Sequence, residues 1–147
     1  MLIGLRNLTP QTVDGFVNLG AVYRKNCKRN DCGIPTFSNT SDSVTLNHKG
    51  LYHVTTVLTV SAEAATDVVV SLFSNGVVIP GATTTVTIAA AGDFANITLD
   101  YYVLVNSICV LGTYSISPET IQVNVTPSVA GTEVNVTNIV TNIETTY

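Results

Sequence analysis

The chain has 147 residues, enough for one domain built around a single hydrophobic core. Its net charge of −4 argues against nucleic acid as a partner, because binding phosphate requires a positive field. Charged residues make up only 11% and hydrophobic residues 46% of the chain, whereas a typical soluble domain carries roughly 25% charge. We therefore expect part of the apolar excess to be buried between subunits.

The first twelve residues begin with a short apolar run but do not look like a targeting signal. No positive charge precedes them, the apolar run is broken at Arg6, and no small-residue cleavage site follows. No stretch reaches the length of a membrane span, so we expect synthesis in a cytoplasm and no membrane partner. Residues 1–12 form a candidate docking segment, unless they pack as a first strand on the chain's own core. The candidate docking side chains are Leu2, Ile3, Leu5 and Leu8.

A strand is expected at residues 15–24, followed by a basic loop that contains two cysteines. Cys27 and Cys32 would stay reduced in a cytoplasm, but they can form a disulfide after release into an oxidising medium. A zinc site is disfavoured because it needs four ligands and few other candidates remain. The basic residues between 24 and 29 can face an acidic partner surface, although a solvated loop is the simpler interpretation.

The clearest strand signal covers residues 50–64, after a shorter expected strand at 43–48. Its apolar residues alternate with polar ones with a period of two, as in a half-buried strand. His48 and His53 are interpreted as solvated surface groups, since no nucleophile motif accompanies them. The expected core face contains Tyr52, Val54, Leu58 and Val60, and the polar face contains His53, Thr55 and Thr59.

A β-hairpin is predicted next. Asn75-Gly76 lies between two apolar runs and can supply the positive φ angles of a two-residue hairpin turn. Pro80-Gly81 interrupts the returning strand. Because proline cannot donate to a strand ladder, this pair predicts a sheet edge or a bulge.

Residues 83–105 predict two more strands around a turn at residues 91–93. In the second of these strands, alternate apolar residues form one face. Tyr102 and Leu104 then make the opposite face apolar as well, which is typical of a partly covered sheet. The residues of the regular apolar face are Ile97, Leu99, Tyr101, Val103 and Val105.

Further strands are expected at residues 107–116, 119–125 and 132–140. Cys109, between two apolar neighbours, is expected to be a small core side chain. Eight or nine short strands without intervening helices indicate an antiparallel sandwich or barrel. No composition shift marks a boundary, so residues 1–147 are expected to form one domain, with 131–147 as a possible C-terminal extension.

Sequence motifs for catalysis are missing. No GxSxG-type elbow and no glycine-rich phosphate loop is present, and Cys27, Cys32, Cys109, His48 and His53 make only a weak metal-binding constellation. We therefore expect a protein that is not an enzyme and has neither a cofactor nor a metal ion.

Three stretches carry a resemblance to a known family. They are YRKNC and CGIPTF, then SVTLNHKGLYHVTTVLTVSAEA, then VVVSLFSNGVVIPGATTTVTIAAAGDFANITL. Across residues 22–111 the chain resembles small virion-associated proteins of phages and prophages of gut bacteria. These have TNF/C1q-type jelly rolls, similar to the C-terminal domains of spore-surface collagen-like proteins. No catalytic residue is transferred by the resemblance.

The resemblance implies a homotrimer of antiparallel jelly-roll sandwiches with apolar side chains along the threefold axis. The implied function is a structural component of a bacteriophage virion, most simply a head decoration or head fibre protein that docks on the major capsid protein. The alternative is a receptor-binding or carbohydrate-binding module of a phage fibre or tail. The sequence lacks tryptophan, which disfavours a sugar-stacking site.

Overall fold

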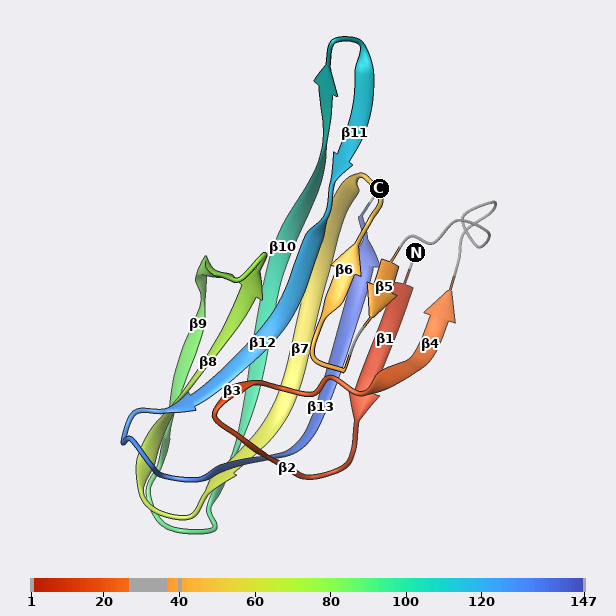
Figure 1. The fold of residues 1–147 in the computed structure, drawn as a ribbon. Coiled ribbons are helices and arrows are strands. Elements are labelled where there is room, and N and C mark those ends of the chain that lie inside the picture. Colours follow the sequence, from red (N-terminus) through yellow and green to blue (C-terminus); the bar gives the residue numbers. More distant parts are fainter. Residues whose placement is uncertain (1, 27–36, 40, 147) are drawn as a thin grey trace.

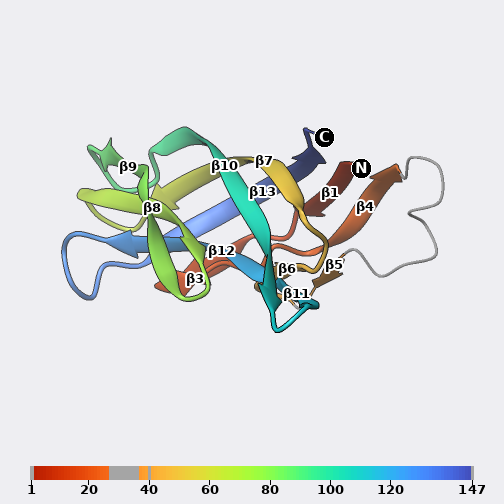
Figure 2. The ribbon, with the colours of Figure 1, turned by 90° about the horizontal axis from the view of Figure 1, so that it is seen from above.

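The computed structural model describes residues 2–26, 37–39 and 41–146, and every regular element within these ranges is a β-strand. No helix in these ranges could span a membrane. The strands form two antiparallel sheets that pack face to face (Figures 1 and 2). This confirms the all-β antiparallel sandwich expected from the sequence. Cys27, Cys32, Lys28 and Arg29 lie outside the described residues.

The larger sheet has seven strands in the order β11-β10-β7-β13-β1-β4, with β2 paired to β13. Its longest members, β7, β10 and β13, run side by side through the centre of the molecule (Figure 1). The bounds of its strands are β1 Leu2–Asn7, β2 Gln11–Val13, β4 Ala21–Asn26, β7 Gly50–Ala62, β10 Phe94–Val110, β11 Thr113–Ser117 and β13 Val134–Thr145.

The smaller sheet has six strands in the order β5-β6-β12-β8-β9, with β3 paired to β12. Its edge strand β9 curls toward β10, so the two sheets approach each other on that side (Figure 2). The bounds of its strands are β3 Gly15–Phe16, β5 Phe37–Asn39, β6 Val44–Leu46, β8 Thr66–Ser74, β9 Val77–Ile88 and β12 Glu119–Pro127.

The core lies between the sheets and is built by the period-two pattern. Along β7 every even-numbered residue from Tyr52 to Ala62 is buried, so the expected core face of this strand is confirmed. The Tyr52 hydroxyl, inside the core, donates to the His48 carbonyl oxygen at 2.7 Å. Burying each large aliphatic side chain of the core, such as Leu58, contributes about 1.5–3 kcal/mol to the free energy of unfolding.

The N-terminal segment is an integral part of the larger sheet. β1 pairs with both β13 and β4, and Ile3 and Leu5 are completely buried in the chain's own core. These two side chains are therefore not available to a partner. Leu2 is half-buried and Leu8 is 62% exposed, so a docking role of these two stays a prediction.

The C-terminal segment is likewise built into the fold. β13 lies between β7 and β1, and its residues pair with both of these strands. Residues 134–145 thus lie in the interior of the sheet. They make up most of the segment 131–147 for which the sequence suggested a C-terminal extension.

The predicted β8–β9 hairpin is confirmed. Ser74 pairs with Val77 across a two-residue turn, in which Asn75 and Gly76 have φ angles of 52° and 78°. β9 is an edge strand, and its pairing with β8 is irregular around Pro80-Gly81, as the proline predicted.

Three local expectations were wrong. Residues 15–24 form two short strands, β3 and β4, because the chain turns at Gly20, whose φ is 80°. Residues 107–116 form a hairpin and not a single strand, with its turn at Leu111-Gly112. Cys109 lies in this hairpin and is exposed, since the opposite sheet does not extend far enough to cover it.

Candidate functional site

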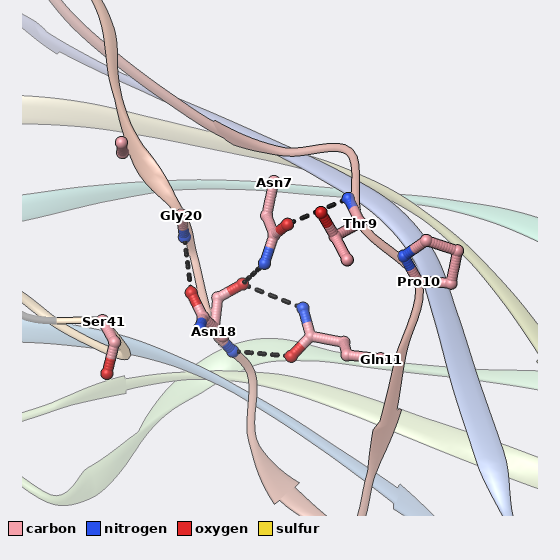
Figure 3. Close-up of a pocket in the computed structure, with 8 residues that line it drawn as sticks. Asn7, Thr9, Pro10, Gln11, Asn18, Gly20 and Ser41 are labelled. Atoms are coloured by element: carbon pink, nitrogen blue, oxygen red, sulfur yellow. Dashed lines mark hydrogen bonds between the residues drawn. The ribbon is translucent and has the colours of Figure 1, made fainter.

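A polar pocket of about 440 Å³ lies where β1, β2 and the segment before β4 meet (Figure 3). Asn18 is at its centre, and its backbone carbonyl accepts hydrogen bonds from Asn7 Nδ2 at 3.1 Å and from Gln11 Nε2 at 2.9 Å. Gln11 Oε1 accepts in return from the Asn18 backbone N–H at 2.9 Å. The residues that line the pocket are Asn7, Thr9, Pro10, Gln11, Asn18, Gly20, Ala21 and Ser41.

The hydrogen bonds of this pocket hold the chain and leave little for a ligand. Asn18 Oδ1 accepts from the Gly20 N–H at 2.9 Å, and Asn7 Oδ1 accepts from the Thr9 N–H at 3.0 Å. No charged side chain lines the pocket. We therefore interpret it as a structural bracket that fixes the path from β1 through β3 into β4.

A histidine-carboxylate pair lies on the outward-facing side of the larger sheet. His53 Nε2 contacts Asp100 Oδ1, and the His53 ring stacks on Tyr102 with 4.7 Å between centroids. The side chains of His53 and Asp100 are 28% and 58% exposed. His53 is thus partnered, where the sequence predicted a solvated group. In the described ranges no serine, threonine or cysteine side chain hydrogen bonds to this pair, so nothing there forms a catalytic triad.

A second polar cluster joins the β8–β9 hairpin to the start of β12. Glu119 Oε2 accepts from Ser74 Oγ and, at 2.9 Å, from Asn75 Nδ2. Asn75 Oδ1 accepts from the Thr120 N–H at 2.9 Å. This cluster connects two strands through side chains that are all satisfied by protein groups, so its role is structural.

Asn75→Ala is expected to lower the free energy of unfolding by about 2–3 kcal/mol. The change removes the hydrogen bonds to Thr120 and Glu119. It also places alanine at a φ of 52°, a backbone conformation that asparagine tolerates better than alanine does. Asn75→Gly is the matched control, because it loses the same bonds but accepts the φ angle. Urea denaturation should therefore place Asn75→Gly between Asn75→Ala and the unmodified protein, and equal loss in both variants would contradict this account.

The exposed apolar side chains gather on β10. Five residues of this strand are large, apolar and exposed, and all five have even numbers, so they point to the same side of the sheet. Odd-numbered residues such as Val103 and Val105 face the core. The five are Phe94 at 68%, Tyr102 at 55%, Leu104 at 54%, Ile108 at 49% and Val110 at 59% exposure.

Strand register places two further apolar residues, with polar neighbours on either side of them, on the same side of the larger sheet. Thr98 of β10 pairs with Val57 of β7, which is 43% exposed, and Val57 pairs with Val140 of β13. Val140 in turn pairs with Arg6 of β1. We call this side of the sheet the outer face, defined by the even-numbered residues of β10 with Val57 and Val140. Among the described residues no strand or loop covers its centre.

Sequence reasoning found the apolar residues of the outer face but not their exposure. Tyr102 and Leu104 made both faces of one strand apolar, which we interpreted as partial covering. Within the described part of the chain that cover does not exist, because both residues are more than half exposed. In the same ranges no group of three metal-ligating side chains comes together.

Comparison with solved structures identifies the fold. The globular domain of zebrafish complement 1qA protein superposes with a TM-score of 0.57, over 99% of this chain and 96% of that chain, at 10% identity. This chain has a C1q-like jelly roll. At that identity the similarity concerns the fold alone.

Two further structures are similar with lower scores. The PRD1 vertex protein P5 has a TM-score of 0.47 at 14% identity, over 97% of this chain and 70% of that chain. CBM35 from Cellvibrio japonicus Abf62 has a TM-score of 0.39 at 15% identity, over 99% and 97% of the two chains. Both similarities are too loose to support a functional argument. No family model and no curated protein sequence matches the chain.

Proposed function

We propose that the protein is a non-enzymatic structural component of a bacteriophage particle, a homotrimeric head decoration or head fibre protein that docks on the shell. The observation that carries this proposal is the outer face, where Val57, Tyr102 and Leu104 are exposed apolar side chains that no described segment covers. Exposed apolar side chains gathered on one side of a sheet favour a protein contact there. The resemblance of residues 22–111 to virion-associated jelly rolls supplies the phage context.

The described polar clusters support a structural role over a catalytic one. Glu119 and Asn18 are engaged in bonds that hold strands or loops together, and the His53-Asp100 pair has no adjacent nucleophile in the described residues. With charge limited to 11% of the chain, its surface suits permanent contact better than free diffusion.

A decoration protein acts by raising the stability of the assembled shell. A protein that binds only the assembled shell stabilises that state by mass action, by about 2.7 kcal/mol per site at a free concentration one hundredfold above Kd. A trimer closed by one repeated interface fits the threefold positions of a shell. The function therefore needs two contact surfaces, one between copies and one toward the major capsid protein.

The test is to mix the purified protein with shells assembled from the major capsid protein of the same phage or prophage. We expect co-sedimentation, density at threefold or quasi-threefold positions in electron cryomicroscopy, and disassembly at a higher temperature than for bare shells. Absence of binding together with specific binding on a glycan array would contradict the proposal and favour the receptor-binding or carbohydrate-binding alternative.

A further inference from the structure

The hairpin formed by the end of β10 and by β11 extends beyond the rest of the molecule. Pairing between β10 and β7 ends where Val105 meets Gly50, and from Asn106 to Val110 the only described partner of β10 is β11. Figure 1 shows this hairpin, residues 106–117, standing clear above every other strand. A two-stranded hairpin by itself is marginally stable in water, so an additional contact would stabilise this projecting part.

Both faces of the hairpin carry exposed apolar side chains. Ile108 and Val110 point to the side of the outer face, whereas Tyr114, at 77% exposure, and Ile116, at 38%, point to the other side. Residues 101–118 contain no aspartate, glutamate, lysine or arginine. The hairpin thus continues the apolar surface of β10 without a charged residue to keep it in water.

The turn of the hairpin carries a conformational cost that the fold does not require. Leu111 has a φ of 50° and is 100% exposed, and Gly112 has a φ of 78°. A left-handed conformation costs a residue other than glycine about 1–2 kcal/mol, and asparagine tolerates it better. The same chain uses asparagine in the equivalent turn at Asn75-Gly76. A strained residue with a fully exposed apolar side chain indicates a contact at this tip.

The two outer edges of the hairpin lack the usual protection. In the described part of the chain, residues 106–110 and 113–117 each pair on one edge only. Edge strands are normally protected by charged residues, by proline or by a covering segment, and within 106–117 neither charge nor proline occurs. A lipid surface would leave these backbone groups unpaired at a cost of several kcal/mol each. Another β-strand would satisfy them.

We propose that the occupant of these edges is a second copy of the same hairpin, with β11 of one copy pairing with residues 106–110 of β10 in the next. When neighbouring hairpins point the same way, these two strands run antiparallel. The two edges belong to different strands, so the contact is heterologous and repeats until it closes a ring. Because the hairpin is uncharged, copies with a net charge of −4 meet there without like-charge repulsion.

This inference rests on the self-association contained in the proposed function and assigns part of that contact to the hairpin. It places Ile108 and Val110 toward the ring axis, on the same side as Tyr102 and Leu104 of the outer face. The tips, with Leu111 at their ends, then meet next to one another. In this arrangement the exposed Leu111 side chains contact one another and the unpaired edges of β10 and β11 form hydrogen bonds between copies.

The experiment compares association by sedimentation equilibrium and hydrogen exchange at the amides of residues 106–117. The double variant Ile108→Lys/Ile116→Lys places a charge on each face of the hairpin, outside the core. We expect about a hundredfold weaker association, because each lysine is transferred from water into the contact. Val77→Lys, at a residue 67% exposed beside the turn of the β8–β9 hairpin, is the matched control and should associate like the unmodified protein.

Leu111→Asn separates folding from association. Asparagine before Gly112 improves the turn, so thermal stability of the monomer should stay equal or rise while association weakens several-fold. In the unmodified oligomer the amides of both hairpin edges should exchange slowly. In the double variant the alternate amides that point away from the partner strand within the hairpin should exchange rapidly.

The outcomes of these measurements distinguish the hairpin contact from the proposed trimer. Association of the double variant equal to that of the unmodified protein overturns the hairpin contact, while an oligomer still disrupted by charges at Val57 and Tyr102 keeps the proposed trimer. A monomeric unmodified protein with unprotected hairpin amides overturns both self-association proposals. Co-sedimentation of that monomer with phosphatidylcholine vesicles would assign the hairpin to a lipid surface instead.

Discussion

Gly20→Ala is expected to lower the free energy of unfolding by about 2–5 kcal/mol. A Cβ at this position would lie 2.1 Å from the carbonyl oxygen of Arg6, and backbone cannot move aside as a flexible side chain can. The φ of 80° adds the cost of a left-handed conformation, about 1–2 kcal/mol, to that of the steric overlap, about 1–3 kcal/mol. The loss should be read from urea denaturation curves.

Gly92→Ala is the matched control for this prediction. Gly92 has a nearly identical φ of 81°, but a Cβ there would meet no atom within 4 Å. The control should therefore lose only the conformational part, about 1–2 kcal/mol. An equal loss in the two variants would show that the approach of Arg6 is not what requires glycine at position 20.

The second large effect is expected on association. Val57→Glu/Tyr102→Glu introduces two acidic groups at the centre of the outer face, in a chain already at −4. If copies meet through this face, each carboxylate must be desolvated next to its symmetry equivalents, and association should weaken at least about a hundredfold. Sedimentation equilibrium measures the change.

Val129→Glu provides the control for the outer-face variant. Val129 is 52% exposed in the connection between β12 and β13, away from the outer face. It should leave the oligomer unchanged, and none of the substitutions touches the core, so the melting temperature of the monomer should change little. An outer-face variant that remains fully associated would contradict a trimer built on this surface.

Local sequence patterns predicted the parts of the fold that depend on local chemistry. The alternation around Val54 and Leu58 identified the buried side of β7, and Asn75-Gly76 identified a hairpin turn together with its backbone angles. Pro80 identified the edge position of β9. In each case one physical requirement, such as a positive φ angle or a missing N–H, excludes most alternatives.

The same reasoning failed where local chemistry was ambiguous. Leucine rarely adopts a positive φ angle, so Leu111-Gly112 gave no turn signal beyond its glycine, and residues 107–116 were predicted as one strand. Cys109 was placed in the core because its neighbours are apolar, and a short apolar run usually indicates a buried strand, yet this one is exposed on both faces.

The outer face could not be predicted from one sequence. Its residues come from β7, β10 and β13, and only the register that pairs Val57 with Thr98 and Val140 brings them together. The same holds for the bracket around Asn18, whose partners Asn7 and Gln11 precede it in the chain without any recognisable motif. Such constellations follow from topology, which sequence patterns constrain only weakly.

The position of β13 also affects how the protein is made. Leu2 pairs with Glu144, so β1 can pair with β4 early but gains its second neighbour only after residues 134–145 have been made. Until then β1 and β7 have an unsatisfied side and can pair wrongly with other nascent chains. Contacts this distant in sequence slow folding, and we expect refolding on the timescale of milliseconds to seconds.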